Sequence, residues 1–350
     1  MKKGLIILSV VCNLALLFYF FKVANQFKKI KDISSSQATV SQKHISGKGI
    51  KKKIAILLPV SHVALDQIKN GFIDTLANNA QLNCEFCIFN ANGSRSLMRA
   101  QIEEILEKKF DVLCTIGALA SQMAKEVTQK KQSNLPIVFA AVANPTQLEL
   151  VNSLIFSGNN LTGSAAESDY PKEVGLLLKI KPSIKKVLIV YDPTQGGGLS
   201  KDNAQVHSLF AQRGVKVKSV EIYNSGEIIQ KIPALLPYYD VVFIFKDNTI
   251  VLAIDALIKL CQQNNILLFT KGLDFVDRGA ALGFGVYERS FGVDAAKCAC
   301  EILVDGKRPS DVQIRVTKDF KLRINSKVIN QQNLGLDKDL LSLIQTVEIT

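Results

Sequence analysis

The stretch KKVLIVYDP (185–193) repeats, in the middle of the chain, the pattern of KKKIAILLP (51–59). In each stretch lysines precede a short apolar run, and a proline follows the run directly in the first stretch and after one aspartate in the second. Such runs are typical of strands that are buried on both faces of a sheet. The repeat indicates that one series of strands and helices begins near residue 51 and that a second, similar series begins near residue 185.

Further apolar runs follow both stretches, and residues with helical spacing, such as Leu65, Ile68 and Phe72, lie between them. The runs expected to be strands are 54–60, 84–89, 111–117 and 136–143 in the first series, and 185–193, 215–222, 240–245, 265–270 and 281–286 in the second. Short strands separated by helices imply parallel sheets covered on both faces. We therefore expect an α/β protein with two doubly wound parallel-sheet lobes and a cleft between them.

The positive charge of the chain is concentrated at its N-terminus. Residues 1–53 hold eleven lysines and one acidic residue, so they carry +10 of the formal charge of +12. The rest of the chain is nearly neutral, which argues against a nucleic-acid-binding surface. The sequence therefore predicts no nucleic-acid partner.

An uncharged run extends from Gly4 to Phe21 behind two lysines. Eighteen helical residues span about 27 Å, close to the bilayer's hydrocarbon core of about 30 Å. No small-x-small cleavage site follows immediately, which favours an uncleaved membrane anchor over a cleaved signal peptide. We expect residues 1–22 to form this hydrophobic helix, anchor or signal peptide, and residues 23–52 to form a flexible tether.

The sequence favours binding over catalysis. Ligands of doubly wound sheets bind beyond the carboxyl ends of the strands, and no Ser-His-Asp or Cys-His combination occurs in the segments that follow the expected strands. The glycines at 196–198 have neither P-loop nor dinucleotide-binding spacing. The cysteine pairs lack the supporting residues of a zinc site and are interpreted as small buried hydrophobes. We expect no catalytic residues, no cofactor and no metal site.

The strongest binding candidates are three polar residues, Asp247, Asn248 and Thr249, which follow the apolar run VVFIF (241–245) and precede a helical pattern. A buried carboxylate there would bind a ligand ammonium group by a charged hydrogen bond. Capping of the following helix is the alternative role for each of the three. Because a helix needs only one capping residue, we expect at least one of them to contact the ligand.

The other candidates follow neighbouring strands. Backbone N–H groups at a helix start after Gly117, with Thr115, Ser121 or Gln122, are suited to a ligand carboxylate, and an ordinary turn is the alternative. Asn144 precedes a proline, which favours an extended backbone that would direct its amide into the cleft. The remaining candidates are Ser61, His62, Asp192, Thr194 and Asp274, for which capping, turn or surface roles are the alternatives.

The chain resembles the extracytoplasmic substrate-binding proteins of ABC importers, in the group with tryptophan- and tyrosine-binding members. The resemblance rests on IAILLPVSHVALDQIKNGF, FAAVANPTQLELV, LTGSAAESDYPKEVGLLLKIKPSIKKVLIVYDP, KDNTIVLAIDAL, FVDRGAALGFGVYERSFGVDAA and ILVDGKRPSDV, in this order. It implies the type I periplasmic-binding-protein fold, in which two hinged lobes close on a small ligand. It also implies pocket-lining residues at the position of Ser61 and His62.

The resemblance further implies a domain order. It places the N-terminal lobe at 53–163, with a later segment near 287–306 returning to it, the C-terminal lobe at 164–320 and a C-terminal extension at 321–350. The implied function is extracytoplasmic binding of a small polar ligand, an aromatic amino acid in particular. The implied partners are an ABC permease and its separate ATPase, with the membrane contacted through the N-terminal segment.

Three other classes of protein are alternatives to this one. A membrane-anchored extracytoplasmic ligand sensor is the alternative function, because an uncleaved anchor would suit it. A hydrolytic or redox enzyme is disfavoured by the missing catalytic combination. A LacI-like repressor shares the implied fold, but an apolar segment stands where its helix-turn-helix would be.

Overall fold

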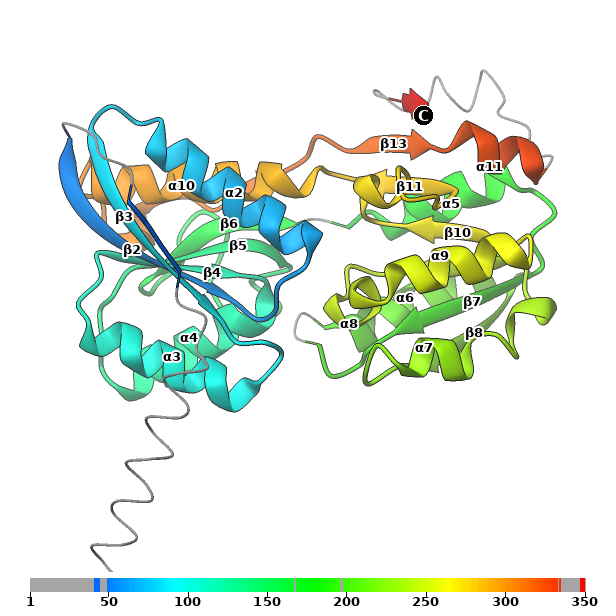
Figure 1. Ribbon diagram of the computed structural model, residues 1–350, viewed down its shortest axis with the longest axis horizontal. Helices are drawn as coiled ribbons and strands as arrows, with labels where there is room; N and C mark the ends of the chain where they lie inside the picture. Colours follow the sequence, from blue (N-terminus) through cyan, green and yellow to red (C-terminus); the bar gives the residue numbers. More distant parts are fainter. Residues whose placement is uncertain are drawn as a thin grey trace, which may run out of the picture.

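The computed structural model describes residues 41–44, 49–166, 168–195, 198–332, 334 and 347–349. Two α/β lobes lie side by side, each built around one sheet (Figure 1). The segment predicted as a membrane helix, residues 1–22, lies outside the described residues. No helix among the described residues combines the length and apolar character needed to cross a membrane.

The first lobe has a sheet of order β1-β3-β2-β4-β5-β6-β12. Every pairing in it is parallel except that of β1 with β3. Helices α2 and α10 pack on one face, while α3 and α4 pack on the other. The elements are β1 (Ser41–His44), β2 (Ile50–Leu58), α2 (Val63–Ala77), β3 (Leu82–Asn90), α3 (Arg95–Glu107), β4 (Val112–Ile116), α4 (Ala118–Lys130), β5 (Ile137–Ala143), β6 (Leu161–Ala166), α10 (Glu288–Leu303) and β12 (Arg315–Thr317).

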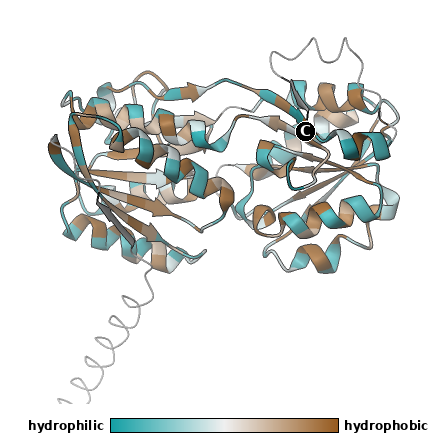
Figure 2. Ribbon diagram, turned by 45° about the horizontal axis from the view of Figure 1, so that its top comes forward, coloured by the Kyte–Doolittle hydropathy of each residue, from teal (hydrophilic) through white to brown (hydrophobic). Residues whose placement is uncertain are grey.

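The second lobe has a sheet of order β14-β13-β11-β10-β9-β7-β8, in which β13 is antiparallel to β11. Helices α5, α6 and α11 cover one face, and α7, α8 and α9 cover the other. The elements are α5 (Tyr170–Ile180), β7 (Lys186–Tyr191), α6 (Leu199–Ala211), β8 (Lys216–Glu221), α7 (Glu227–Lys231), β9 (Val241–Ile244), α8 (Asn248–Leu252), α9 (Ile254–Gln263), β10 (Leu267–Thr270), β11 (Leu282–Gly285), β13 (Lys321–Ile324), α11 (Ser326–Gln331) and β14 (Val347–Ile349). Figure 2 shows apolar residues concentrated on the strands, where the helices cover them.

The chain passes between the lobes after β6, after β11 and after β12 (Figure 1). These crossings differ in detail from the expected boundaries. Strand β6 extends to Ala166 in the first sheet, past the boundary at 163/164, because it pairs along β5. Strand β12, inside the expected C-terminal lobe, pairs with β6 in the first lobe. Strand β13, expected to belong to an extension, pairs with β11 in the second sheet.

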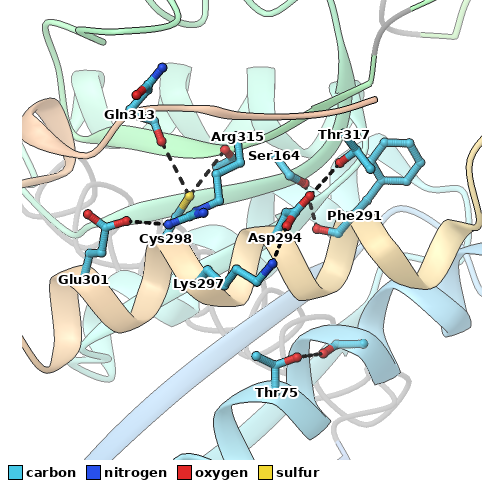
Figure 3. Close-up of polar contacts among 12 residues, drawn as sticks. Thr75, Ser164, Phe291, Asp294, Lys297, Cys298, Glu301, Gln313, Arg315 and Thr317 are labelled. Atoms are coloured by element: carbon cyan, nitrogen blue, oxygen red, sulfur yellow. Dashed lines mark hydrogen bonds and ion pairs between the residues drawn. The ribbon is translucent and has the colours of Figure 1, made fainter. Parts of the chain in front are cut away.

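Helix α10 returns to the first lobe and is held there by polar contacts (Figure 3). The Ser164 hydroxyl on β6 donates to the Phe291 carbonyl at 2.8 Å, and the Thr317 hydroxyl on β12 donates to Asp294 at 2.9 Å. Arg315 on β12 donates to Glu301 at 3.0 Å. These bonds join helix and sheet across 14 to 127 residues of sequence, so the crossings that precede and follow α10 have firm attachment points.

A glycine on α10 permits close contact with α2. A Cβ atom at Gly292 would lie 1.9 Å from the carbonyl oxygen of Ile68 and 2.8 Å from the amide nitrogen of Phe72. Because that obstacle is backbone, Gly292→Ala is expected to force the helices apart and to lower the free energy of unfolding by about 1–3 kcal/mol in urea titration. The control is Gly175→Ala within α5, where a Cβ atom meets nothing within 4 Å. It should stabilise the protein by about 0.5–1 kcal/mol, and equal effects of the two variants would contradict the packing argument.

Candidate functional site

A cavity lies between the lobes, at the edge where the carboxyl ends of the parallel strands of both sheets are directed. Its lining residues are Pro59, His62, Ala64, Leu65, Ile68, Gly117, Ala118, Leu119, Ala141, Ala143, Ala166, Ser168, Tyr170, Gln195, Leu199, Asp202, Phe245, Lys246, Asp247, Asn248, Val251, Lys271, Gly272, Phe275 and Glu288. The apolar share of this wall suits a small ligand with a hydrophobic part, and the polar residues would orient it. Of the residues predicted from sequence, His62, Gly117, Asp247 and Asn248 line the cavity.

His62 connects the two lobes. Its Nδ1 accepts the Leu65 N–H at 3.4 Å and caps helix α2, so that nitrogen carries no proton. The proton is therefore on Nε2, which donates to Asn248 Oδ1 of the second lobe at 3.0 Å. Burial lowers the pKa of His62 below its usual range. The imidazole is accordingly a neutral group at pH 7 and adds no charge to the cavity.

The three polar residues after β9 divide the capping and contact roles. Asp247 is the N-cap of α8, and its carboxylate accepts the N–H groups of Thr249 at 2.9 Å and Ile250 at 3.3 Å. It also accepts the Asp192 N–H at 2.5 Å, which ties the end of β7 to the end of β9. Burial raises the pKa of Asp247 to about 7 against the effect of these donors. Asn248 contacts the opposite lobe through His62, so its side chain lies in the cavity.

Asp192 supports the cavity wall from behind. Its carboxylate accepts from the Thr194 hydroxyl at 2.6 Å, the Thr249 hydroxyl at 2.7 Å and Gln195 Nε2 at 3.2 Å. Burial acts to raise the pKa of Asp192, but the hydrogen bonds outweigh it and leave the pKa below its usual range. Gln195 then accepts from Asn248 Nδ2 at 3.2 Å. Asp192, Thr194 and Thr249 thus hold the wall in place but do not line the cavity.

Other polar contacts also bridge the lobes. Lys246 in the second lobe forms an ion pair of 2.6 Å with Glu288 at the start of α10, and both residues line the cavity. At the rim, Arg95 donates to the Thr194 carbonyl at 2.9 Å. These contacts require the lobes to be close together, so the structure represents a closed arrangement of the cleft.

A lysine and two acids form a buried cluster in the second lobe. Lys271, whose side chain is 5% exposed, pairs with the fully buried Glu173 at 2.7 Å and donates to Ser168 at 2.8 Å. Its ammonium also lies 4.4 Å from the centre of the Tyr170 ring. Asp202, in the first turn of α6, interacts with both Tyr170 and Lys271. Lys271, Ser168, Tyr170 and Asp202 line the cavity, while Glu173 lies behind them.

The start of helix α4 faces the cavity through its backbone. Gly117 is its N-cap with φ of 83°, no side chain caps it, and Gly117, Ala118 and Leu119 line the cavity. The Thr115 and Ser121 hydroxyls, predicted as ligand contacts, are fully buried and bond to each other at 2.9 Å. They brace the turn but do not line the cavity, and neither does Gln122.

The three remaining predicted residues also lie away from the cavity lining. Ser61 is exposed and donates to Asp66 at 3.0 Å. Asn144 has φ of 47°, which corrects the extended backbone expected before Pro145, and its carbonyl accepts the Leu148 N–H at 3.1 Å. Asp274 is half-buried, and burial raises its pKa, opposed by a hydrogen bond with Gln67 of α2.

Sequence reasoning missed six polar residues of the cavity wall: Ser168, Gln195, Asp202, Lys246, Lys271 and Glu288. Two of them lie at strand ends, Lys246 two residues after β9 and Lys271 directly after β10, and this position was the available signal. No group of three or more histidine, cysteine or acidic residues suited to a metal occurs in the described ranges.

Comparisons with known proteins agree on one family. The family model described as ABC transporter substrate binding protein matches residues 53–348. A curated relative, the tyrosine-binding protein of Clostridioides difficile strain R20291, is 25% identical over 292 residues, which cover 82% of this chain and 83% of the relative.

Solved structures show the same fold. A conserved domain protein from Vibrio cholerae is 26% identical, with a TM-score of 0.78 over 85% of this chain and 99% of that one. An ABC domain from Streptococcus pneumonia in complex with L-Trp is 22% identical, with a TM-score of 0.76 over 85% of this chain and 100% of that one. The two-lobe arrangement therefore recurs at low sequence identity.

Proposed function

The chain belongs to the ABC transporter substrate-binding protein family, and we propose that it binds an aromatic amino acid between its two lobes. Members of this family are extracytoplasmic and present a small molecule to an ABC permease. The observation that carries the choice of ligand is a cavity with aromatic rings on one lobe and an uncapped helix start on the other. The names of two relatives, one tyrosine-binding and one solved with L-Trp, support the same choice.

The aromatic part of the ligand would lie against rings of the second lobe. Tyr170, Phe245 and Phe275 line the cavity, and Leu65 and Ile68 of α2 close it from the first lobe. Tyr170 and Phe245 are already in edge-to-face contact, with ring centres 5.9 Å apart. A further ring stacked beside such a pair contributes about 0.5–1.5 kcal/mol beyond the burial of its area.

The ligand carboxylate would bind at the start of α4. The first N–H groups of a helix have no partner within the helix, and they carry the positive end of its dipole. At α4 no side chain satisfies them, and the residues around them line the cavity. In this proposal the carboxylate of the amino acid would lie on the first lobe and its aromatic ring on the second.

Contacts from both lobes make ligand binding favour the closed form, because an open cleft offers only half of them. The His62–Asn248 hydrogen bond and the Lys246–Glu288 ion pair exist only when the lobes meet. Closure thus produces a shape that differs between the loaded and the empty protein, and the permease would recognise that shape. We further propose that residues 1–22 anchor the protein to the outer face of the membrane that holds the permease.

Thermal unfolding of the full-length protein tests the choice of ligand. Tested against the twenty amino acids, sugars and nucleosides, L-tyrosine or L-tryptophan should raise the melting temperature by several degrees. A ligand at a hundred times its Kd adds about 2.7 kcal/mol to the stability of the folded state. A rise with a sugar or nucleoside and none with an aromatic amino acid would overturn the proposal.

A further inference from the structure

The acids around the cavity outnumber the bases that lie close to them. Lys246 is neutralised by Glu288, and Lys271 by Glu173, in ion pairs of 2.6 and 2.7 Å. Asp202 lines the same cavity, is 7% exposed, and has no ion pair with any described residue. A carboxylate removed from water without a positive partner is costly. When all three groups are ionised, the cluster of Lys271, Glu173 and Asp202 therefore carries one uncompensated negative charge.

The other acids near the cavity are already occupied. The carboxylate of Asp247 accepts three backbone N–H groups, and that of Asp192 accepts two hydroxyl groups and an amide. Glu288 is held by Lys246. Asp202 differs from them in its partners: among the described side chains its carboxylate has a hydrogen bond from Tyr170 and no ion pair, and burial raises its pKa. Its carboxylate retains the capacity for another donor.

We infer that Asp202 binds the ammonium group of the ligand and so restricts the ligand to compounds that carry a primary amine. This inference rests on the proposed function and identifies the residue that selects the charged end of the ligand. The Tyr170 hydroxyl donates to the Asp202 carboxylate, so an ammonium bound there would lie next to that hydroxyl as well as the carboxylate. A ligand of this kind restores the missing positive charge when the lobes close.

Asp202 thus takes the ammonium-binding role that the sequence predicted for Asp247. Both residues belong to the second lobe, and both line the cavity. The carboxylate oxygens of Asp247, however, already accept hydrogen bonds from the first turn of α8 and from the Asp192 N–H. Asp202 lies on a longer helix, α6, whose N-cap is Gly198, and its backbone N–H bonds to the Gly198 carbonyl at 3.1 Å. The side chain of Asp202 is thus not needed as the helix cap.

Titration calorimetry of the wild-type full-length protein with a series of indole compounds is the first test. L-tryptophan carries both charged groups, indole-3-propionate lacks the ammonium, and tryptamine lacks the carboxylate. We expect indole-3-propionate to bind at least tenfold more weakly than L-tryptophan, because it leaves Asp202 without its partner. Equal affinity of these two compounds would overturn the inference but leave the proposed function intact. If neither L-tryptophan nor L-tyrosine binds, the proposed function fails and the inference with it.

The variant Asp202→Asn is the second test. It should weaken L-tryptophan binding roughly ten- to a hundredfold, the loss of one charged hydrogen bond, while it changes indole-3-propionate binding less than twofold. The control Asp255→Asn removes an acid of the same lobe whose side chain is 71% exposed and pairs with Arg278. It should leave both affinities unchanged. Equal weakening of both compounds by Asp202→Asn would overturn the inference, because a general change of cavity shape would explain it.

Discussion

Lys271→Met is expected to lower the free energy of unfolding by about 3–5 kcal/mol at pH 8, the usual cost of removing one partner of a buried ion pair. Glu173 is fully buried, and the ammonium of Lys271 is the only partner that the structure gives to its carboxylate among the described side chains. Without the lysine, an uncompensated charge would remain inside the second lobe. Urea titration of the full-length protein measures the loss.

The loss should depend on pH in a defined direction. Burial raises the pKa of Glu173, and the charge and hydrogen bond of Lys271 oppose that rise. The variant removes the opposition, so its folded-state pKa lies still higher above the unfolded value of about 4.3. A carboxyl with a raised folded-state pKa binds its proton more tightly when folded, and stability falls as the pH rises through that interval. The deficit of Lys271→Met should therefore be small near pH 5 and full at pH 8.

Two further variants separate the buried pair from ordinary surface charge. Lys108→Met breaks an exposed pair with Glu104 and should cost less than about 1 kcal/mol. The double variant Lys271→Met, Glu173→Leu replaces both charges by apolar groups and should recover most of the loss. If Lys271→Met costs no more than Lys108→Met, the pair does not have the structural role assigned to it.

The same lysine links the cavity to the first crossing between the lobes. Ser168, its second partner, lies just after β6, where the chain leaves the first lobe, and Tyr170 begins α5 in the second. A ligand ammonium at Asp202 would thus lie beside the group that holds this crossing. The same cluster of side chains would then contact both the charged group of the ligand and this crossing.

The long apolar strands of the fold could be predicted from sequence because burial on both faces leaves a continuous run such as Val241–Ile244. Strand β6, with the sequence LTGSAA, could not, since its small residues give no such run. These small residues are required by contacts with segments that are distant in the sequence. A Cβ atom at Gly163 would lie 1.9 Å from the Phe139 carbonyl oxygen, and Ser164 is needed to hold α10.

The candidate site was predictable where its residues follow strands and unpredictable where distant segments meet. Asp247 and Asn248 were predicted because they lie just beyond an apolar run, with Lys246 between the run and Asp247. Glu173 and Lys271 are 98 residues apart, and nothing in either local sequence indicates that they pair. The division of roles within the polar triplet was also hidden, because both a cap and a ligand contact call for the same residue types.

Asp247→Ala is expected to lower the free energy of unfolding by about 2–4 kcal/mol, which combines the loss of a helix cap with buried N–H groups left unpaired. The groups affected are the N–H donors of Asp192, Thr249 and Ile250.

Asn248→Ala should have the opposite profile, with a change in stability below about 1 kcal/mol and L-tryptophan affinity reduced roughly three- to tenfold. The reason is that its bond to His62 forms only when the lobes close, so its loss penalises the bound state. Urea titration and calorimetry on both variants decide the matter: a tenfold loss of affinity in Asp247→Ala at unchanged stability would restore Asp247 as the ligand contact.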